Sequence, residues 1–284
     1  MKRAAADKPA QEKVLVVDDD RATRQVLRDV LASAGFGASV AKDGMEALDL
    51  VRKKRFDLLL LDVWMPRMNG LELLERLRSR KTRPRVVIMT SDDAPETLLK
   101  AVRQQAFQYV HKPVDAKALL RMVRDTLKAP EPVRIEVLSA RPEWVELVVP
   151  CTRGAAEQLQ PVMAHLDTNL DPKLRETIAY AFRELLLNAI EWGGRLDPSR
   201  KVRISYLRAK RMLMYRIADP GSGFDLQNLP HAAIGSADGP IAHMQVREEK
   251  GIRPGGFGLL MVSNSVDELL YNEKRNEVVF VKYL

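Results

Sequence analysis

Cysteine is almost missing from this sequence, because Cys151 is the only one in 284 residues. A single cysteine cannot form a disulfide within the chain. This excludes the small disulfide-stabilised folds of secreted proteins and predicts a reducing, cytoplasmic location. Cysteines without a chemical role are far more common than reactive ones, so we expect Cys151 to be unreactive.

Long hydrophobic runs are also missing. No apolar stretch approaches the roughly 18–20 residues that cross a membrane. The N-terminal sequence MKRAAADKPAQEK has no apolar segment of the kind that a secretory signal carries. We therefore expect neither a membrane-spanning segment nor a signal peptide, and we interpret residues 1–12 as a flexible arm.

Acidic residues are outnumbered, since 46 Lys+Arg against 38 Asp+Glu give a net charge of +8. The excess lies in residues 1–129, mainly in Arg52–Arg55 and between Arg76 and Arg85. A basic patch can attract nucleic acid, but no recognition-helix pattern accompanies these charges. We interpret them as solvated helix ends, where cations are favoured, and expect no direct partner among nucleic acids or membranes.

The length of the chain suggests two domains, and two kinds of pattern divide it. Residues 13–128 alternate five times between a short apolar run and an amphipathic helical stretch. This predicts an α/β domain with a five-stranded, doubly wound parallel sheet that helices cover on both faces. Pro130 and Pro132 interrupt the pattern and indicate a linker, which we place at residues 129–139.

In the remaining part, residues 140–284, strands and helices are grouped separately, which predicts an α+β two-layer sandwich. Helical patterns cover residues 154–167, 172–192 and 257–265. Strands are expected at residues 144–149, 202–208, 213–219, 267–272 and 277–284.

Apolar strands in the first domain end at carboxylates. The run KVLVVDDD ends at Asp18 and Asp19, and the run LLLLD ends at Asp62. The carboxyl ends of parallel strands meet at one edge of the sheet, so these side chains should converge. A hard divalent cation such as Mg²⁺ relieves their repulsion. Thr90 and Lys112 end the next two strands, which completes a pocket suited to phosphoryl transfer.

Residues 13–128 resemble the receiver domain of response regulators. The resemblance implies that Asp62 is phosphorylated and that Mg²⁺ is held by Asp18, Asp19, Asp62 and the backbone carbonyl of Trp64. Because receivers take their phosphate from histidine kinases, it also implies an upstream histidine kinase as a partner.

Three further positions follow from the same resemblance. Thr90 and Lys112 are expected to bind the phosphoryl group, and the Lys112–Pro113 peptide is expected to be cis. Thr90 and Tyr109 are expected to act as the switch, with Tyr109 turning inward on phosphorylation.

The second domain carries polar residues where a plain amphipathic helix would be apolar. Glu184 and Asn188 lie four residues apart and so project from one face of a helix. Their side chains offer a carboxylate base and a neutral oxygen for a metal. Asp219 ends a strand. Glycines that let a backbone approach a ligand or phosphate closely follow at Gly221, Gly223, Gly256 and Gly258.

The order and spacing of these groups resemble the ATP-binding domain shared by gyrase, Hsp90, histidine kinases and MutL, the GHKL or Bergerat fold. The resemblance covers roughly residues 140–284. It implies that Asn188 binds Mg²⁺ and that Asp219 recognises the adenine amino group of ATP. A mobile lid, from which Arg253 would reach the phosphates, is then flanked by Gly221, Gly223, Gly256 and Gly258.

Within that superfamily the anti-sigma-factor serine kinases are most similar. They are short and end in a GNxV-like strand, here Asn276-Glu-Val-Val. They also lack a helix pair with a phosphorylatable histidine, and none of the four histidines of this chain lies in such a motif. The chain departs from the pattern at Trp192, where these kinases often carry histidine.

Two phosphoryl-handling domains in one chain predict a signalling switch. Phosphorylation of Asp62 would control the ATP domain, a serine/threonine protein kinase that acts on a regulator such as an anti-sigma antagonist, with Glu184 as general base. Two alternatives stay open. The domain either sequesters a sigma factor or another regulator without phosphotransfer, or serves a histidine on another protein. The resemblance also leaves a homodimer open.

Overall fold

The computed structural model describes residues 11–78, 83–91, 94–129, 133–167, 169–224 and 257–284. The chain forms two compact units, and the main division between them falls after Glu131. Among the described residues, no helix is both long enough and apolar enough to cross a membrane.

The first unit is built on a five-stranded sheet in the order β2-β1-β3-β4-β5, in which all neighbours are parallel. The central strands β1 and β3 are buried on both faces, which explains why their sequences are continuous apolar runs. The strands are β1 (Lys13–Val17), β2 (Gly37–Ala41), β3 (Leu58–Leu61), β4 (Arg85–Thr90) and β5 (Gln108–His111).

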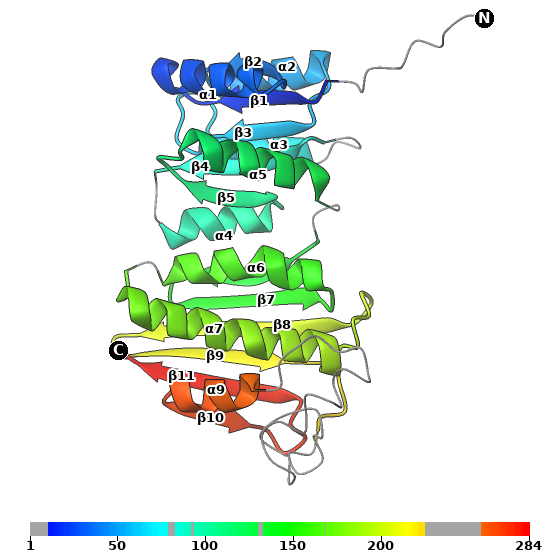
Figure 1. Ribbon diagram of the computed structural model, residues 1–284, viewed down its shortest axis with the longest axis vertical. Coiled ribbons are helices and arrows are strands. Elements are labelled where there is room, and N and C mark those ends of the chain that lie inside the picture. The colour runs from blue at the N-terminus through cyan, green and yellow to red at the C-terminus, as the bar shows by residue number, and fades with distance from the viewer. Residues whose placement is uncertain (1–10, 79–82, 92–93, 130–132, 168, 225–256) are drawn as a thin grey trace, which may run out of the picture. The chain divides into compact units, whose positions relative to one another are not determined.

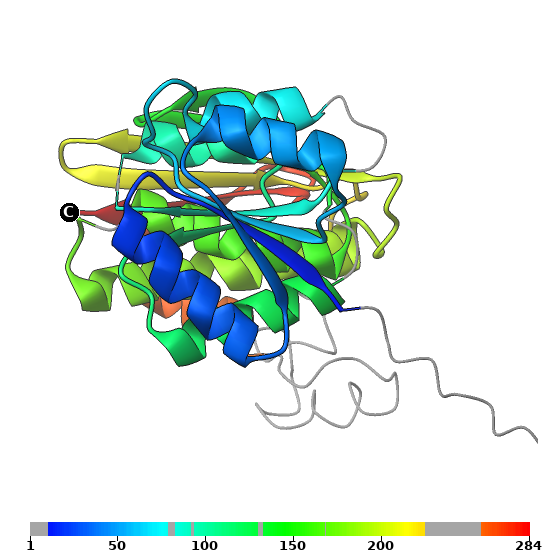
Figure 2. The ribbon, with the colours of Figure 1, turned by 90° about the horizontal axis from the view of Figure 1, so that it is seen from above.

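Helices cover both faces of this sheet (Figure 2). On one face α1 (Arg21–Ser33) and α5 (Ala116–Lys128) form a core with β1, β3 and β4. On the other face α2 (Gly44–Lys53), α3 (Gly70–Arg78) and Ala101 of α4 (Pro95–Arg103) form a second core. The expected five-stranded, doubly wound α/β architecture is confirmed.

Aspartates fix the starts of three of these helices. The side chains of Asp20, Asp43 and Asp115 accept hydrogen bonds from backbone N–H groups in the first turns of α1, α2 and α5. Such caps satisfy donors that have no partner within the helix. Because Asp20 caps α1, Asp18 and Asp19 are left for another role.

The second unit contains a six-stranded sheet in the order β10-β11-β9-β8-β7-β6, in which all neighbours are antiparallel. Buried and less buried residues alternate along β7 and β9, as in a sheet that is covered on one face. The strands are β6 (Glu136–Arg141), β7 (Trp144–Pro150), β8 (Lys201–Ala209), β9 (Met212–Ala218), β10 (Glu268–Tyr271) and β11 (Glu277–Tyr283).

Three helices lie on one side of this sheet, namely α6 (Arg153–Leu166), α7 (Pro172–Asn188) and α9 (Gly258–Ser265) (Figure 1). Aromatic rings fill the space between the layers. The ring of Tyr215 lies 5.2 Å or less, between centroids, from those of Phe182, Tyr206 and Phe280. The expected α+β two-layer sandwich is confirmed.

A buried carboxylate joins the two layers. The hydroxyls of Tyr206 and Tyr215 donate hydrogen bonds to the two oxygens of Asp167, at 3.0 and 2.8 Å. Asp167 directly follows α6 and is 1% exposed. The end of α6 is therefore anchored to the central strands β8 and β9.

Two elements of the second unit differ from our expectation. β6 occupies residues that we placed partly in the linker, and it is an edge strand whose pairing with β7 shifts between Val137 and Ser139. The helix expected over residues 172–192 is α-helical only to Asn188. It continues as a π-helical turn, η1 (Ala189–Gly193), closed by a 2.8 Å hydrogen bond from the N–H of Gly194 to the carbonyl of Ala189.

Candidate functional site

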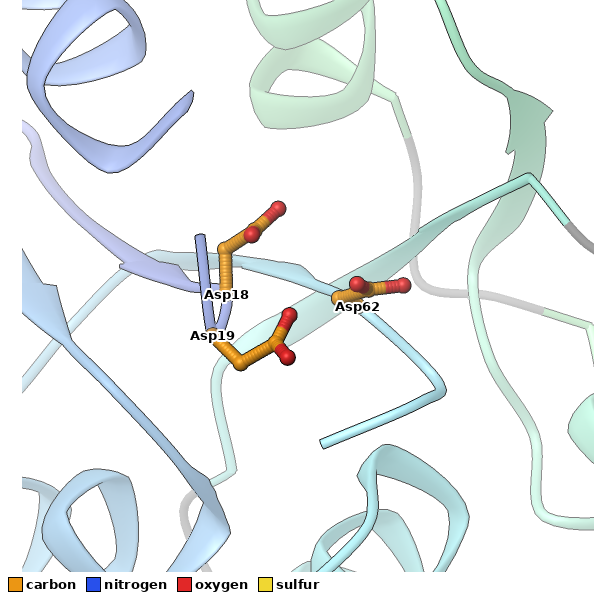
Figure 3. Close-up of side chains that lie close together, drawn as sticks. All are labelled: Asp18, Asp19 and Asp62. Carbon is orange, nitrogen blue, oxygen red and sulfur yellow. The ribbon is translucent and has the colours of Figure 1, made fainter. Parts of the chain in front are cut away.

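Three carboxylates gather at the carboxyl edge of the first sheet, just beyond β1 and β3. Figure 3 shows the side chains of Asp18, Asp19 and Asp62 around one point, and one oxygen from each lies within 4.8 Å of the others. Asp18 and Asp62 are buried, and Asp19 is exposed. The convergence expected from the sequence is present.

Lys112, at the end of β5, brings a positive charge into this cluster. Its Nζ lies 2.6 Å from Oδ2 of Asp18 and 2.9 Å from Oδ2 of Asp62. The peptide between Lys112 and Pro113 is cis, as expected. The ammonium therefore bridges the two buried carboxylates and offsets part of their repulsion.

The electrostatics of the cluster follow from burial and this pairing. Burial raises the pKa of Asp62 above its usual value and the charge of Asp18 adds to the rise, while Lys112 opposes it. Burial alone would lower the pKa of Lys112, but its hydrogen bonds to Asp18 and Asp62 outweigh that effect and raise it. Lys112 therefore stays protonated beside the carboxylate that we expect to react.

The other predicted residues of this site lie close by along the chain or the sheet. Thr90 is fully buried at the end of β4, and its carbonyl accepts the N–H of Lys112 at 2.9 Å. Tyr109 on β5 is partly buried and packs against the core beneath α2 and α3. Trp64 lies two residues after Asp62, with its indole 59% exposed.

The loop after Asp62 is fastened to the start of α2. Arg67, in the left-handed region with φ 67°, forms an ion pair with the buried Asp43 that caps α2. One residue further on, the carbonyl of Met68 accepts the N–H of Gly44 at 3.1 Å. These contacts hold the loop that carries the carbonyl expected to bind metal.

The donor set of the cluster fits Mg²⁺, because among the described residues only carboxylate oxygens converge there as possible metal ligands, with no histidine or cysteine. Asp18, Asp19 and Asp62 would hold the ion. When bound, Mg²⁺ neutralises charge on a transferring phosphoryl group.

A cavity of about 520 Å³ lies in the second unit beside the end of α7. This is a usual size for a small-molecule site. Four residues that we predicted to bind the nucleotide line it, namely Asn188, Asp219, Gly221 and Gly223. Arg253 and Gly256, also predicted, lie outside the described residues.

Asp219 is fixed at the floor of this cavity. Its Oδ1 accepts the N–H of Gly221 at 2.7 Å. Burial raises the pKa of its carboxyl, while this hydrogen bond and the charge of Arg200 oppose the rise. A Cβ on Gly193 would lie 2.1 Å from the same Oδ1, so only glycine lets the π-helical turn approach the carboxylate this closely.

Two predicted residues, Glu184 and Gly258, do not line the cavity. They lie against each other, because a Cβ on Gly258 would come within 2.5 Å of Oε2 of Glu184. The start of α9 therefore approaches the Glu184 carboxylate, one helical turn before Asn188 on α7.

Sequence reasoning gave no binding role to several further cavity residues. It noted Trp192 only as a departure from the kinase pattern, and Tyr271 and Arg275 come from a part of the chain far from α7. Two features of the sequence could have indicated them. One is an aromatic residue directly before glycines, and the other is the presence of arginines in turns. These residues include the aromatics Trp192, Phe224 and Tyr271 and the arginines Arg195, Arg200 and Arg275.

Cys151 contacts the residue that follows the π-helical turn of this site. It is fully buried, and burial raises the pKa of its thiol to about 11. A Cβ on Gly194 would lie 2.2 Å from its Sγ, so the thiol packs directly against the residue that ends the π-helical turn. These properties agree with the expected lack of reactivity.

Comparison with known families assigns both units. Residues 14–124 match the response regulator receiver domain, and residues 152–282 match the histidine kinase-like ATPase domain. This pairing supports two-component signalling with an ATP-binding output.

Curated relatives are response regulators. Response regulator MprA of Mycobacterium sp. (strain KMS) is 32% identical over 181 residues, which are 64% of this chain and 69% of the relative. DNA-binding response regulator MtrA of Mycolicibacterium smegmatis is 33% identical over 204 residues, which are 70% of this chain and 88% of the relative.

Solved structures of similar proteins include a CheY-like receiver domain protein from Methanospirillum hungatei, with 27% identity and a TM-score of 0.41 over 42% of this chain and 94% of that one. From the family matches and the curated relatives we conclude that this chain belongs to the response-regulator family, with a receiver domain followed by a histidine kinase-like ATPase domain.

Proposed function

We propose that this protein is a phosphorylation-controlled protein kinase of the anti-sigma-factor type. An upstream histidine kinase phosphorylates Asp62, and the state of Asp62 controls an ATP domain that phosphorylates a serine or threonine of a downstream regulator, such as an anti-sigma antagonist. The observation that carries the proposal is the presence, in one chain, of the Asp62 cluster and of a cavity lined by Asn188 and Asp219.

The receiver chemistry follows from the geometry of the cluster. An oxygen of Asp62 attacks the phosphorus of a phosphohistidine, the P–N bond breaks, and its electron pair returns to the imidazole. Lys112 lies 2.9 Å from Asp62 and offsets negative charge on the acyl phosphate. Thr90, at the neighbouring strand end, supplies a hydroxyl for a phosphate oxygen.

Within the described part of the ATP domain, Glu184 is our candidate base. Glu184 lies on α7 beside the start of α9, one turn before Asn188. In the proposed reaction Glu184 takes the proton of the partner's hydroxyl as that oxygen bonds to the γ-phosphorus. The bond to the β–γ bridging oxygen breaks and ADP leaves.

Transfer can be tested with the full chain, γ-labelled ATP and a soluble protein fraction from the source cells. We expect labelling of a protein on serine or threonine by the wild type. Glu184→Ala should lose this labelling but keep ATP binding, because the base is removed and the cavity is not. The matched control is Glu176→Ala, an exposed glutamate on the same helix.

The possible results of this experiment distinguish the proposed kinase from the two alternative functions. Labelling that survives in Glu184→Ala would show that Glu184 is not the base. A wild type that binds ATP and captures a regulator without labelling it would instead support sequestration, and label on histidine would support service to another protein's histidine.

A further inference from the structure

Arg200 lines the cavity of the second unit from a position directly before β8, where it is partly buried. Its backbone is held on both sides. The N–H of Arg200 donates to the carbonyl of Asp197 at 3.1 Å, and its carbonyl accepts the N–H of Cys151 at 2.9 Å. The guanidinium group therefore extends into the cavity wall from a fixed point of the backbone.

The side chain of Arg200 reaches the turn that carries Asp219. Its Nη2 donates a hydrogen bond to the carbonyl of Pro220 at 2.5 Å. The next carbonyl, that of Gly221, accepts a hydrogen bond from Nδ2 of Asn276 at 3.1 Å. Two side chains from the starts of different strands, β8 and β11, thus hold consecutive carbonyls of this turn. The position of the Asp219 carboxylate therefore depends in part on Arg200.

The charge of Arg200 also acts on the Asp219 carboxyl. Burial raises the pKa of this carboxyl, and the N–H of Gly221 and the charge of Arg200 oppose the rise. The charge of Asp219 also reaches the thiol of Cys151, whose pKa of about 11 keeps it neutral. The other titratable groups around the turn and the cavity are Arg195, Asp197, Tyr271, Arg275 and Glu277. Arg200 therefore favours the ionised form of a carboxyl that burial alone would protonate more easily.

The ionisation state of Asp219 decides which chemical group it can bind. A carboxylate only accepts hydrogen bonds, whereas a protonated carboxyl also donates one. A purine with an amino group at the contacted position fits the carboxylate, and a purine with a carbonyl group there would bring two acceptors together. Protonation would remove this preference, because the hydroxyl of the carboxyl could donate to the purine carbonyl.

We propose that Arg200 is a positioning residue that holds Asp219 in place as an ionised acceptor, and so makes the cavity prefer a purine nucleotide with an amino group over one with a carbonyl group at the same ring position. The proposal rests on the proposed binding of ATP. Arg200 acts through Asp219 and does not itself have to contact the base.

The test compares ATP with inosine triphosphate (ITP), which has a carbonyl group in place of the amino group and the same triphosphate. The ratio of the two affinities is thus independent of how the triphosphate titrates. Calorimetric titration of the full chain with the Mg²⁺ complexes measures this ratio from about pH 5 to 8. At the upper end, wild type should bind ATP about 10- to 150-fold more tightly than ITP, the range for a hydrogen bond to a charged group.

Arg200→Gln keeps an N–H donor but removes the charge. Without that charge the pKa of Asp219 rises further, so Asp219 takes up a proton at a higher pH. The preference for ATP should therefore begin to fall at a higher pH than in wild type. Arg200→Lys keeps the charge and should follow the wild-type profile. Arg203→Gln is the matched control, because this exposed arginine of β8 is not among the described residues that line the cavity.

A second measurement leaves Arg200 unchanged. The infrared difference spectrum between wild type and Asp219→Asn, both without nucleotide, shows whether Asp219 is a carboxylate or a protonated carboxyl. At neutral pH we expect the carboxylate. This measurement does not require Arg200→Gln to fold.

Four results would overturn the role of Arg200 and leave ATP binding intact. They are an Arg200→Gln profile identical to that of wild type, an Arg200→Lys profile that follows Arg200→Gln, equal affinities of wild type for ATP and ITP, and a protonated Asp219 at neutral pH. A loss of affinity in Arg200→Gln that is equal for ATP and ITP at every pH would likewise mark Arg200 as part of the domain's packing. A wild type that binds neither nucleotide would overturn the proposed function and this role together.

Discussion

At the scale of single residues, Gly193 sets how closely the π-helical turn approaches Asp219. An added Cβ would lie 2.1 Å from Oδ1 and 2.2 Å from Cγ of that carboxylate, so the Asp219 side chain would have to move. We predict that Gly193→Ala lowers ATP affinity by about tenfold or more, as overpacking of a fitted site does. Gly154→Ala is the control, because its Cβ would meet nothing closer than 3.5 Å. Equal affinities in both variants would contradict the prediction.

Asp167 allows a prediction about pH. Burial raises the pKa of its carboxyl above the usual value, although hydrogen bonds from Tyr215 and Tyr206 oppose this. At pH values between the pKa of Asp167 in the unfolded protein and its pKa in the folded protein, the folded protein keeps the carboxyl proton that the unfolded protein has lost. Stability therefore falls as pH rises through this window and does not recover above it.

Asp167→Asn removes the ionisation and keeps an acceptor. We expect its stability relative to wild type to improve as the pH rises from about 4 to 7, measured by urea unfolding. Asp167→Ala should instead lose about 1–3 kcal/mol, because the tyrosine hydroxyls lose their acceptor. A wild type that gains stability over Asp167→Asn with rising pH would show that the sign is wrong.

At the scale of elements, the ion pair between Arg67 and Asp43 ties the loop after Asp62 to α2. The Asp43 side chain is 1% exposed and that of Arg67 is 55% exposed. We predict that Arg67→Ala weakens Mg²⁺ binding by about tenfold, the lower range for loss of a group that orients metal ligands. Calorimetric titration with Mg²⁺ measures this. Arg52→Ala, which breaks an exposed pair with Asp49, should bind Mg²⁺ normally.

The elements also show what the sequence could and could not predict. The acidic site was predictable, because Asp18 and Asp62 each follow an uninterrupted buried strand and parallel strands place their ends together. β6 was not, because it is an edge strand with an irregular register after prolines. The π-helical turn was not either, since the residues of η1 also fit an α-helical pattern.

The cavity was predictable only in part. Asn188 was marked because it is polar where an amphipathic helix would be apolar, and Asp219 because it ends a strand just before two glycines. Tyr271 reaches the same cavity from β10, and no spacing in the chain connects it with α7. Contacts between distant elements depend on the sheet order, in which β11 separates β10 from β9.

At the scale of the whole molecule, the two domains are expected to be coupled. Coupling free energies are typically about 1–3 kcal/mol, or about 5- to 150-fold in affinity. We predict that beryllofluoride, an acyl-phosphate mimic, changes the affinity of the full chain for ATP by a factor in this range. By thermodynamic linkage ATP must change the affinity for beryllofluoride by the same factor.

Two titrations check this reciprocity, one with ATP at saturating beryllofluoride and one with beryllofluoride at saturating ATP. Asp62→Asn is the control and should show no response to beryllofluoride. Identical ATP affinities with and without the mimic in the wild type would contradict coupling.

Chemical labelling of Cys151 can report local opening of the protein. It is the only thiol in the chain, it is buried, and it packs against Gly194, which directly follows the cavity residue Gly193. A thiol reagent can modify it only while that packing is transiently broken, so the labelling rate in native buffer measures how often the contact between Cys151 and Gly194 opens. A ligand that binds only the closed form will slow labelling in proportion to its occupancy. One rate measured without any engineered label would then follow ATP binding, and its dependence on beryllofluoride would follow the signal from Asp62.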